Sequence, residues 1–337
     1  DAALADLAVE PVDVVVSDMR MPTCDGAELL RRVAQGHPET IRIILSGQTS
    51  EDAALRAAPV AHRFLSKPCS PELLVDAIGR LTAQKQRYSG TLARLVGQVQ
   101  ALPAPPTLFV TLDALMADPA AGVGDVTALI KSAPLVAAKL LQLVNSSFFL
   151  ASQTITSVDA AISRLGLRLV RAVVVSEGVF STMRTHADLV EAARRHGAVA
   201  MELAARIAPA QLRDASVTAA LLARIGLPLL ATVAPEHLDE IRAAVDAGAH
   251  PAVIERFTIG ATCDALAAHV LSMWNLPAEV VDAVAMHRHE PAAWDVRGIV
   301  AVAARLADGL PVDIEGLRSI GAPAAAIDAL LQVRAVA

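Results

Sequence analysis

The chain has 337 residues, of which 54% are hydrophobic and 19% charged, so it has the length and apolar content of a globular protein with two domains. Its formal net charge of -6 argues against a nucleic-acid-binding groove. The three cysteines are scattered and form neither a disulfide framework nor a zinc pattern. No uncharged apolar run approaches membrane-spanning length. We therefore expect a cytoplasmic protein with no membrane and no nucleic-acid partner.

Residues 1–82 alternate between strand and helix patterns. The runs "VDVVVS" (12–17) and "IRIILS" (41–46) are rich in β-branched residues, as buried parallel strands are, and "HRFL" (62–65) is a weaker third strand. The helical stretches "GAELLRRVAQ" and "SEDAALRAA" lie between them. This order predicts a βαβ arrangement with a parallel sheet covered by helices.

The string "VVVSDMRMPTCDG" places Asp18 at the carboxyl end of a predicted strand, where open α/β sheets carry their chemistry. The strings "IILSGQ" and "FLSKP" follow in order, with Ser46 and Lys67 after the next two strands. Together they resemble the receiver domain of two-component response regulators, which has a flavodoxin-like fold. The resemblance implies that Asp18 accepts a phosphoryl group, that Ser46 and Lys67 contact its oxygens, and that a cis peptide bond precedes Pro68.

The chain departs from the receiver pattern at its amino end. It begins in what resembles the second helix of the family, so the first strand, the first helix and the second strand, on the order of 40 residues, are missing. The missing part would supply the acidic pair that binds Mg²⁺. We therefore expect Mg²⁺ to be needed for receiver phosphorylation in the full-length protein, with a longer amino terminus than the one given.

Residues 83–101 form a predicted helical linker. A heptad-like spacing of apolar positions, with one polar position, runs through Leu74, Ile78, Leu81, Lys85, Tyr88, Leu92, Leu95, Val99 and Leu102. "SG" at 89–90 interrupts the pattern. Two interpretations stay open: a helix that packs on its own domains, or a short coiled coil that joins two chains into a homodimer.

Residues 102–337 read as an all-helical domain in which strand patterns nearly vanish. Its helices carry readable caps. In "TITSVDAAISRLGL", Thr156 stands three residues before Asp159 and predicts a helix start, while Gly166 predicts its end. In "VNSSFF" we expect Asn145 and Ser146 to bond the backbone at a helix end, and Trp274 should anchor another helix end in the core.

The helical half resembles the HDOD domain, a non-enzymatic relative of the HD-domain phosphohydrolases. The matching strings, in family order, are "ALPAPP", "ALIKSAPLVAAKLLQLVNSSFF", "ITSVDAAISRLGLRLVRAVVV", "RRHGAVAMELAARIA", "ALLARIGLPLLA", "LSMWNLPAEVVDAV" and "MHRHEP".

Active HD enzymes bind a divalent metal through a His, a His-Asp pair and a later Asp. By the resemblance, His196 matches the first His, while the His-Asp pair falls on Ala223 and Arg224. Cys263 stands where many HDOD sequences keep another His, and His287 matches the first His of a common pair. Alanine offers no ligand and a guanidinium repels a cation, so we expect no metal, no cofactor and no hydrolysis at this degenerate site.

Arg224 lies in the apolar stretch "ALLARIGLPLLA" and needs a partner, since burying a lone guanidinium is costly. Three interpretations stay open. It is an ion-paired, partly exposed residue near a helix end, a structural substitute for the metal that joins neighbouring helices, or part of an anion site with His196, His287 and Arg288.

The predicted protein is thus a response regulator with a receiver domain and an HDOD output domain that works by protein contact and is not an enzyme. A cognate histidine kinase and a signalling protein docking on the HDOD domain are the expected partners. The alternatives are a metal-dependent phosphodiesterase of the HD superfamily and a nucleotide sensor that uses the former metal site.

Overall fold

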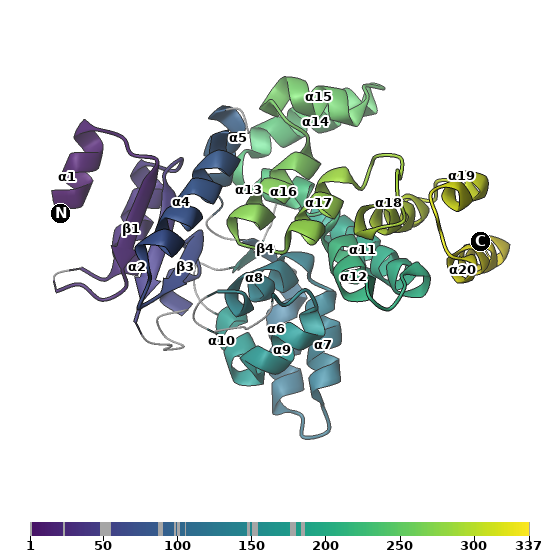
Figure 1. Ribbon diagram of the computed structural model, residues 1–337, viewed down its shortest axis with the longest axis horizontal. Coiled ribbons are helices and arrows are strands. Elements are labelled where there is room, and N and C mark those ends of the chain that lie inside the picture. The colour runs from purple at the N-terminus through teal and green to yellow at the C-terminus, as the bar shows by residue number, and fades with distance from the viewer. Residues whose placement is uncertain are drawn as a thin grey trace.

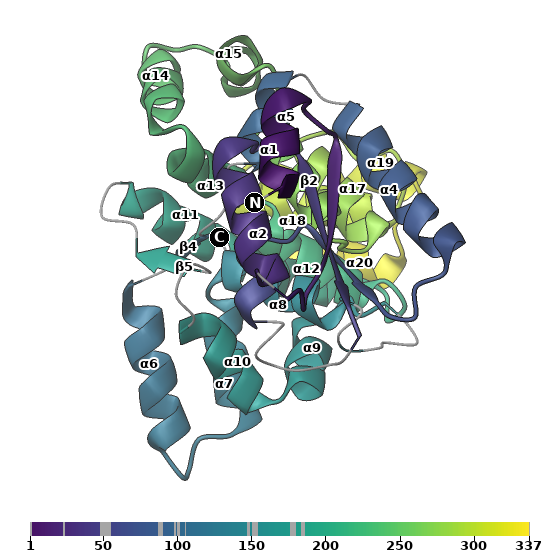
Figure 2. The same cartoon turned by 90° about the vertical axis from the view of Figure 1, so that its left-hand side faces the viewer.

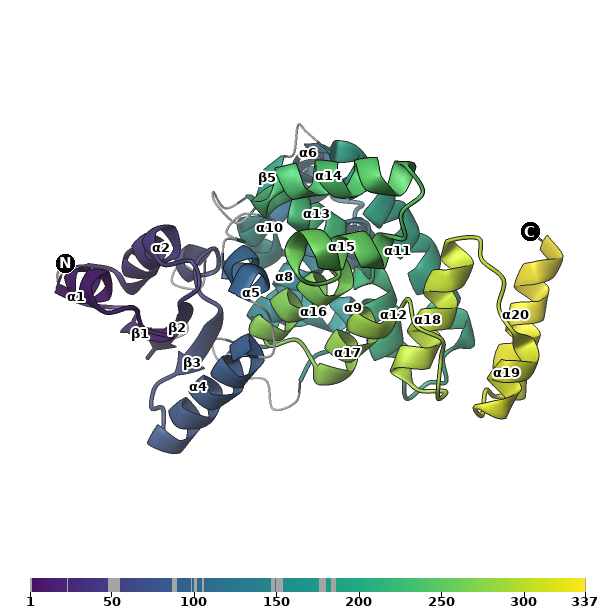
Figure 3. The same cartoon turned by 90° about the horizontal axis from the view of Figure 1, so that it is seen from above.

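The computed structural model of the chain describes residues 2–22, 24–47, 55–86, 90–97, 99, 102–104, 106–146, 149, 154–175, 180–182 and 186–336. A small parallel sheet with its helices lies at one end of the molecule, and a larger helical domain makes up the rest (Figure 1). The amino and carboxyl ends of the chain lie at opposite ends of the molecule in Figures 1 and 3.

The amino-terminal domain contains three parallel strands in the order β1-β2-β3. They are β1 (Val14–Asp18), β2 (Ile41–Ser46) and β3 (Arg63–Ser66). Asp18 pairs with Leu45, and Ser46 pairs with Ser66, so all three strands end at the same edge of the sheet. The predicted βαβ arrangement is confirmed, including the weak third strand.

Helices cover both faces of this sheet. They are α1 (Ala2–Val9), α2 (Gly26–Gly36) and α4 (Pro71–Gln86), with α2 and α4 on opposite faces (Figure 3). The side chain of Asp25 starts α2 by accepting a hydrogen bond of 2.7 Å from the backbone N–H of Ala27. A small core of its own fills the space under α2 and includes Leu30, Ile44 and Phe64.

Most of the described residues of the linker are helical, and they pack within the chain. The linker contains the end of α4 and the helix α5 (Gly90–Gly97). Leu81, Leu92 and Leu95 of the heptad-like pattern are at most 3% exposed and belong to the main apolar core. Tyr88, in the same pattern, lies outside the described residues. The described part of the seam therefore corresponds to the interpretation in which the linker packs on its own domains.

The helical domain is built from fifteen described helices and two short strands. The helices are α6 (Pro106–Ala117), α7 (Val123–Lys131), α8 (Pro134–Val144), α9 (Val158–Leu165), α10 (Leu167–Val175), α11 (Ala187–Ile207), α12 (Arg213–Leu222), α13 (Gly226–Val233), α14 (Pro235–Asp246), α15 (Pro251–Ile259), α16 (Cys263–Met273), α17 (Ala278–Met286), α18 (Val296–Ala307) and α19 (Ile314–Ser319), and they are followed by the carboxyl-terminal α20 (Ala324–Val336).

One element of this domain was not predicted from the sequence. The strands β4 (Leu102–Ala104) and β5 (Phe180–Thr182) form a parallel pair in the otherwise helical half. Each strand has three residues, too few for an alternation of apolar and polar positions to be recognisable. Figure 2 shows the pair beside α11 and above α6.

The predicted helix ends are confirmed, with one correction. Gly166 ends α9 at a φ of 76°, as expected for a glycine stop. The N-cap of α9 is Ser157, whose Oγ accepts from the N–H of Ala160, so the prediction of Thr156 was wrong by one residue. The carbonyl of Thr156 instead accepts a hydrogen bond of 2.6 Å from the Oγ1 of Thr218, a contact across the fold.

Asn145 and Trp274 behave as predicted from "VNSSFF" and "WNLP". The side-chain amide of Asn145 ends α8 by exchanging two hydrogen bonds of 2.8 Å with the backbone of Ile155. Trp274 ends α16 at 5% exposure, and the Nζ of Lys139 lies 4.8 Å from the centre of its ring.

Apolar packing is continuous between the two domains. The main core contains Ile41 and Ile43 of β2, Leu92 of α5, and buried side chains from most of the helices of the helical domain. Helix α8 lies at its centre, with every residue buried. Helix α16 packs against both α4 and α5, so the linker is held between the sheet and the helical domain.

No single helix among the described residues has both the length and the apolar composition needed to cross a bilayer. Two consecutive pairs pass that test only when joined, α7 with α8 and α12 with α13, and these pairs bend by 115° and 41°.

Candidate functional site

Asp18 and Lys67 meet at the carboxyl edge of the sheet. Lys67 Nζ lies 2.6 Å from Asp18 Oδ2, and both side chains are about two-fifths exposed, at 41% and 37%. The hydrogen bond from Lys67 lowers the pKa of the Asp18 carboxyl below its usual value, with a smaller contribution from the backbone N–H of Arg20. The acidic group is therefore a solvent-accessible anion with a cation directly beside it, as a carboxylate nucleophile for phosphoryl transfer requires.

Ser46 and the chain around Asp18 complete this edge. Ser46 ends β2, the strand beside β1, and is 8% exposed. The Lys67–Pro68 peptide bond is cis, as the resemblance implied. A Cβ on Gly26 would lie 2.0 Å from the carbonyl oxygen of Asp18, so only glycine lets the first turn of α2 approach the acidic residue so closely.

The described residues do not by themselves provide a Mg²⁺ site at this edge. Asp18 offers one carboxylate, and one of its oxygens is already bonded to Lys67. Among the described residues no three His, Cys, Asp or Glu side chains are close enough to share a metal ion. Mg²⁺ prefers several oxygen ligands in octahedral geometry, so additional carboxylates would have to come from outside these residues.

Arg224 lies between α12 and α13 and forms an ion pair across the fold. Its guanidinium NH2 lies 2.5 Å from Oδ2 of Asp308, the residue that caps the carboxyl end of α18. The two side chains are 28% and 29% exposed. Ala223, directly before it, is 1% exposed and ends α12. Arg224 is thus partly exposed, ion-paired at a helix end and joined to a distant helix, which agrees with the first two of its three interpretations.

Two buried histidines lie beside this ion pair. The Nε2 of His196, on α11, is 3.6 Å from Asp308 Oδ1, and the Nε2 of His287, at the end of α17, is 3.8 Å from Asp264 Oδ1. Both distances are too long for hydrogen bonds, and neither Nε2 has a hydrogen-bond partner among the described residues. Burial, with Arg224 as a second cause for His196, lowers the pKa of each ring to about 4, so both are neutral at pH 7.

A second ionic cluster lies at the start of α16. Arg288 Nε is 3.0 Å from Asp264 Oδ2, and Arg288 NH1 is 3.3 Å from Glu255 Oε1. The other oxygen of Glu255 accepts a hydrogen bond of 2.8 Å from the backbone N–H of Cys263. Burial raises the pKa of Asp264 to about 6 and that of the Cys263 thiol well above its usual value, so the thiol stays protonated.

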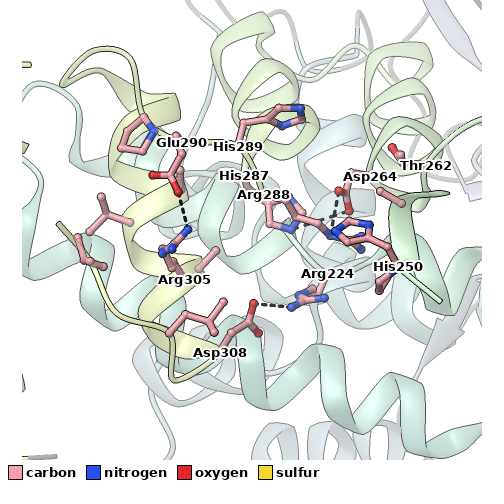
Figure 4. A pocket seen from close by; sticks show the side chains of 18 of the residues that line it. Arg224, His250, Thr262, Asp264, His287, Arg288, His289, Glu290, Arg305 and Asp308 are labelled. Carbon is pink, nitrogen blue, oxygen red and sulfur yellow. Dashed lines mark hydrogen bonds and ion pairs between the residues drawn. The ribbon is translucent and has the colours of Figure 1, made fainter. Parts of the chain in front are cut away.

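A cavity of about 780 Å³ opens between α14, α15, α16, α18, α19 and the segment that follows α17. Arg224, Asp264, His287 and Arg288 lie along one side of it, together with Asp308 (Figure 4). Apolar lining side chains come from α14, α18 and α19, among them Ile241, Val302 and Leu317. The volume falls in the range of small-molecule pockets. The lining guanidiniums of Arg224 and Arg288 point to carboxylates of the protein itself, as the dashed lines in Figure 4 show.

The fold brings the residues singled out from the sequence into two places. Asp18, Ser46 and Lys67 lie at one sheet edge, while Arg224 and His287 line the cavity and His196 lies beside Asp308. Sequence reasoning missed the carboxylates that partner the arginines: Asp308, Asp264 and Glu255. Only Asp264 had a local signal, since it directly follows Cys263.

Sequence profiles of two families match the chain. The HDOD domain matches residues 102–291, and the response regulator receiver domain matches residues 1–79. The chain is 38% identical over 98 residues to the hydrogenase transcriptional regulatory protein HoxA of Cupriavidus necator, which covers 28% of this chain and 20% of HoxA. It is also 38% identical over 97 residues to the response regulator protein PilR of Pseudomonas aeruginosa, covering 27% and 22%. The chain thus spans about a fifth of each relative's length.

The fold is similar to a solved structure. A virulence factor from Campylobacter jejuni superimposes with a TM-score of 0.57 at 19% identity, over 72% of this chain and 97% of that one. At this identity the likeness concerns the fold alone.

Proposed function

The chain belongs to the HDOD family and carries a response regulator receiver domain, and we propose that phosphorylation of Asp18 controls protein contacts made by a non-catalytic HDOD domain. A histidine kinase is the proposed source of the phosphoryl group, and the cytoplasm is the proposed location. The observation that carries the proposal is the Asp18–Lys67 pair of 2.6 Å, beside Ser46, at the carboxyl edge of the sheet.

The electrostatics of this edge fit phosphoryl acceptance. An ionised carboxylate attacks the phosphorus, and the negative charge then added must be neutralised by donors already in place. Lys67 supplies an ammonium, and Ser46 lies at the end of the neighbouring strand. Upon phosphorylation the Lys67 ammonium would exchange a carboxylate oxygen for phosphoryl oxygens, so the charge pairing at this edge would change.

The chemistry at Ala223 and Arg224 supports a non-catalytic HDOD domain. In HD enzymes these two positions provide a histidine and a carboxylate to the metal, whereas here one side chain is a methyl group and the other a cation. Arg224 also forms an ion pair with Asp308, the carboxylate that lies beside His196. What the domain then offers to other molecules is its surface, and we propose a cytoplasmic signalling protein as the partner.

The proposal is tested in the full-length protein with beryllofluoride as the phosphoryl mimic. We expect the mimic to bind at Asp18 and to change the affinity for a captured partner at least about fivefold, the usual scale of such coupling. Asp18→Asn should abolish both effects. Asp6→Asn, an exposed carboxylate on α1, is the matched control and should behave like the wild type.

Two results would contradict the proposal. Equal partner affinity with and without the mimic would mean that the state of Asp18 does not control the contacts of the HDOD domain. Turnover of bis-p-nitrophenyl phosphate with Mn²⁺, lost upon His196→Ala, would instead support the alternative of a metal-dependent phosphodiesterase.

The cavity of about 780 Å³ favours a second candidate, the sensing of a small ligand by the HDOD domain. Its mixed lining of apolar side chains with Arg224 and Arg288 suits an amphipathic molecule with an anionic group. A phosphate-bearing ligand would have to displace Asp308 or Asp264 from these arginines. Calorimetry with nucleotides distinguishes the two candidates, since heat of binding that disappears in Arg224→Met would support the second one.

A further inference from the structure

Polar side chains are buried where the receiver domain meets the linker and the HDOD domain. Arg42 of β2 is 1% exposed, His62 before β3 is 6% exposed, and Gln142 of α8 is 2% exposed. Buried polar groups need partners, and the partners of these three come from different parts of the chain. The junction therefore depends on specific bonds in addition to apolar packing.

Arg42 donates four hydrogen bonds from its guanidinium to backbone carbonyls in this junction, and the guanidinium also contacts the ring of His62. Its side-chain nitrogens contact Val60 O at 2.8 Å, Thr40 O at 3.1 Å, Pro38 O at 3.2 Å, Gly97 O at 3.2 Å and His62 Nε2 at 2.8 Å. All of these partners are neutral, and burial lowers the pKa of Arg42 to about 10, so the residue stays charged at pH 7. A guanidinium with five fixed donors is suited to joining several backbone segments at one point.

Gly97 brings the linker directly against the receiver. It ends α5, and a Cβ at this position would lie 1.7 Å from the carbonyl oxygen of Pro38, just before β2. No side chain fits at that distance. The carbonyl of Gly97 in turn accepts a hydrogen bond from Arg42. The linker helix and the start of β2 are thus joined by a backbone contact and by a side-chain bond.

The HDOD domain joins the same junction through α8. The Nε2 of Gln142 lies 3.4 Å from Ala61 O and 3.5 Å from His62 O, both just before β3. Burial, with smaller contributions from Arg42, His269 and Lys139, holds the pKa of His62 well below its usual value. The receiver domain, the linker helix α5 and the HDOD helix α8 therefore meet at the amino ends of β2 and β3.

The phosphoryl-contacting residues lie at the other ends of the same two strands. Ser46 ends β2, four residues after Arg42, and Lys67 follows β3, five residues after His62. Four residues of strand span about 13 Å. β2 and β3 are paired from Ile43–Arg63 to Ser46–Ser66, so two hydrogen-bonded strands connect the phosphoryl-contacting residues with the junction.

We propose that this junction, formed by Arg42, His62, Gly97 and Gln142, is a clamp through which β2 and β3 pass the state of Asp18 to the linker and the HDOD domain. The inference rests on the proposed function, because it assigns a route to the same regulation. It places the coupling at the amino edge of the sheet, on α5 and α8.

Hydrogen–deuterium exchange of the full-length protein tests the clamp, with Gly97→Ala as the disrupting variant. The matched control is Gly79→Ala in α4, where an added Cβ meets nothing within 4 Å. We expect amides of residues 90–97 to exchange at least about tenfold faster in Gly97→Ala than in the wild type, and the control to leave them unchanged. Gln142→Leu, which keeps a buried apolar stem but removes the donor, should give the same direction of change.

Adding beryllofluoride tests transmission in the same experiment. In the wild type, exchange should change both around Asp18 and in α5, whereas in Gly97→Ala it should change around Asp18 alone. Unaltered exchange of α5 in Gly97→Ala, or a response of α5 to the mimic that survives in this variant, would overturn the clamp. A missing response at Asp18 itself would count against the proposed function, and the comparison of Gly97→Ala with Gly79→Ala would still decide whether the clamp exists.

Discussion

At the scale of single residues, Arg224 shows how an apolar helix pair accommodates a cation. Its partner Asp308 lies 84 residues away, and both side chains keep a little more than a quarter of their surface in water. An ion pair in this setting contributes about 1 kcal/mol or less to stability, because solvent screens it. The pair therefore matters more for geometry and charge than for stability. It fixes a guanidinium, paired with Asp308, at the position where an HD enzyme has a metal-binding carboxylate.

The buried histidines make stability depend on pH. Burial lowers the pKa of His196, His269 and His287 to about 4. Between about pH 6.5 and 4 these histidines are therefore protonated in the unfolded chain but mostly neutral in the folded protein. The contribution of these histidines to stability is therefore fully present above about pH 6.5 and is lost as the pH falls towards 4. Asp264, with its pKa raised to about 6, acts in the opposite sense, since the folded protein binds its proton more tightly. The histidines outnumber it, so acid destabilises the fold.

We predict that His287→Asn reduces this pH dependence. Asparagine can donate to Val284 O, as His287 Nδ1 does at 2.8 Å, but it takes up no proton on unfolding. Between pH 6.5 and 4.5 the slope of unfolding free energy against pH should fall by about 1 kcal/mol per pH unit, somewhat below the value for one full proton. Urea denaturation at several pH values measures the slope. An unchanged slope would mean that His287 is protonated in the folded protein.

At the scale of elements, α5 shows how a heptad-like pattern is satisfied within one chain. Leu92 is fully buried, Leu95 is 3% exposed, and α16 packs against this helix. A coiled coil between chains would need the same side chains to face outwards. The helix thus serves as a spacer between the receiver sheet and the HDOD core, with Gly97 at its end touching the loop before β2.

We predict that Leu92→Asp destabilises the fold and leaves the association state unchanged. Burying a carboxylate in place of an apolar side chain costs several kcal/mol, here about 4 kcal/mol of unfolding free energy. Leu73→Asp, at a position on α4 that is 60% exposed, is the control and should change stability by less than about 0.5 kcal/mol. Denaturation and sedimentation are measured together. If the wild type sediments as a dimer and Leu92→Asp as a stable monomer, the coiled-coil interpretation would be correct instead.

At the scale of the whole molecule, the two domains share one apolar core. Ile41 and Ile43 of the receiver sheet lie in the same cluster of buried side chains as Leu140 of α8 and Leu266 of α16. The receiver keeps only a small cluster of its own, under α2. A domain that buries its sheet against its neighbour cannot lose that neighbour without exposing apolar surface. The receiver and the HDOD domain are therefore energetically coupled.

We predict that the chain unfolds in one cooperative transition. Scanning calorimetry should give a single peak whose calorimetric and van't Hoff enthalpies agree, because unfolding either domain exposes the shared core. Fluorescence of Trp274 and Trp294, both in the helical domain, and circular dichroism should report the same midpoint. Two separate peaks, or midpoints that differ between these probes, would show that the domains unfold independently.

The sequence by itself determined the features that follow from local rules. β-branched runs predicted three parallel strands, and successive parallel strands end at one edge, so Asp18, Ser46 and Lys67 could be expected to meet. Gly166 marked a helix end because glycine takes a positive φ without strain. In each case the cause lies within a few residues of the effect.

Only the tertiary structure decided which distant groups became partners. Nothing near Arg224 in the sequence points to Asp308, and nothing near Arg42 points to Gly97, which lies 55 residues further on. The same holds for the apolar face of α5. Its heptad-like pattern is equally compatible with packing inside the chain and with packing against a second chain. Periodicity specifies that a face is apolar or that a charge needs a partner, but the choice of partner depends on how the helices pack, and this is set by the shape of the whole core.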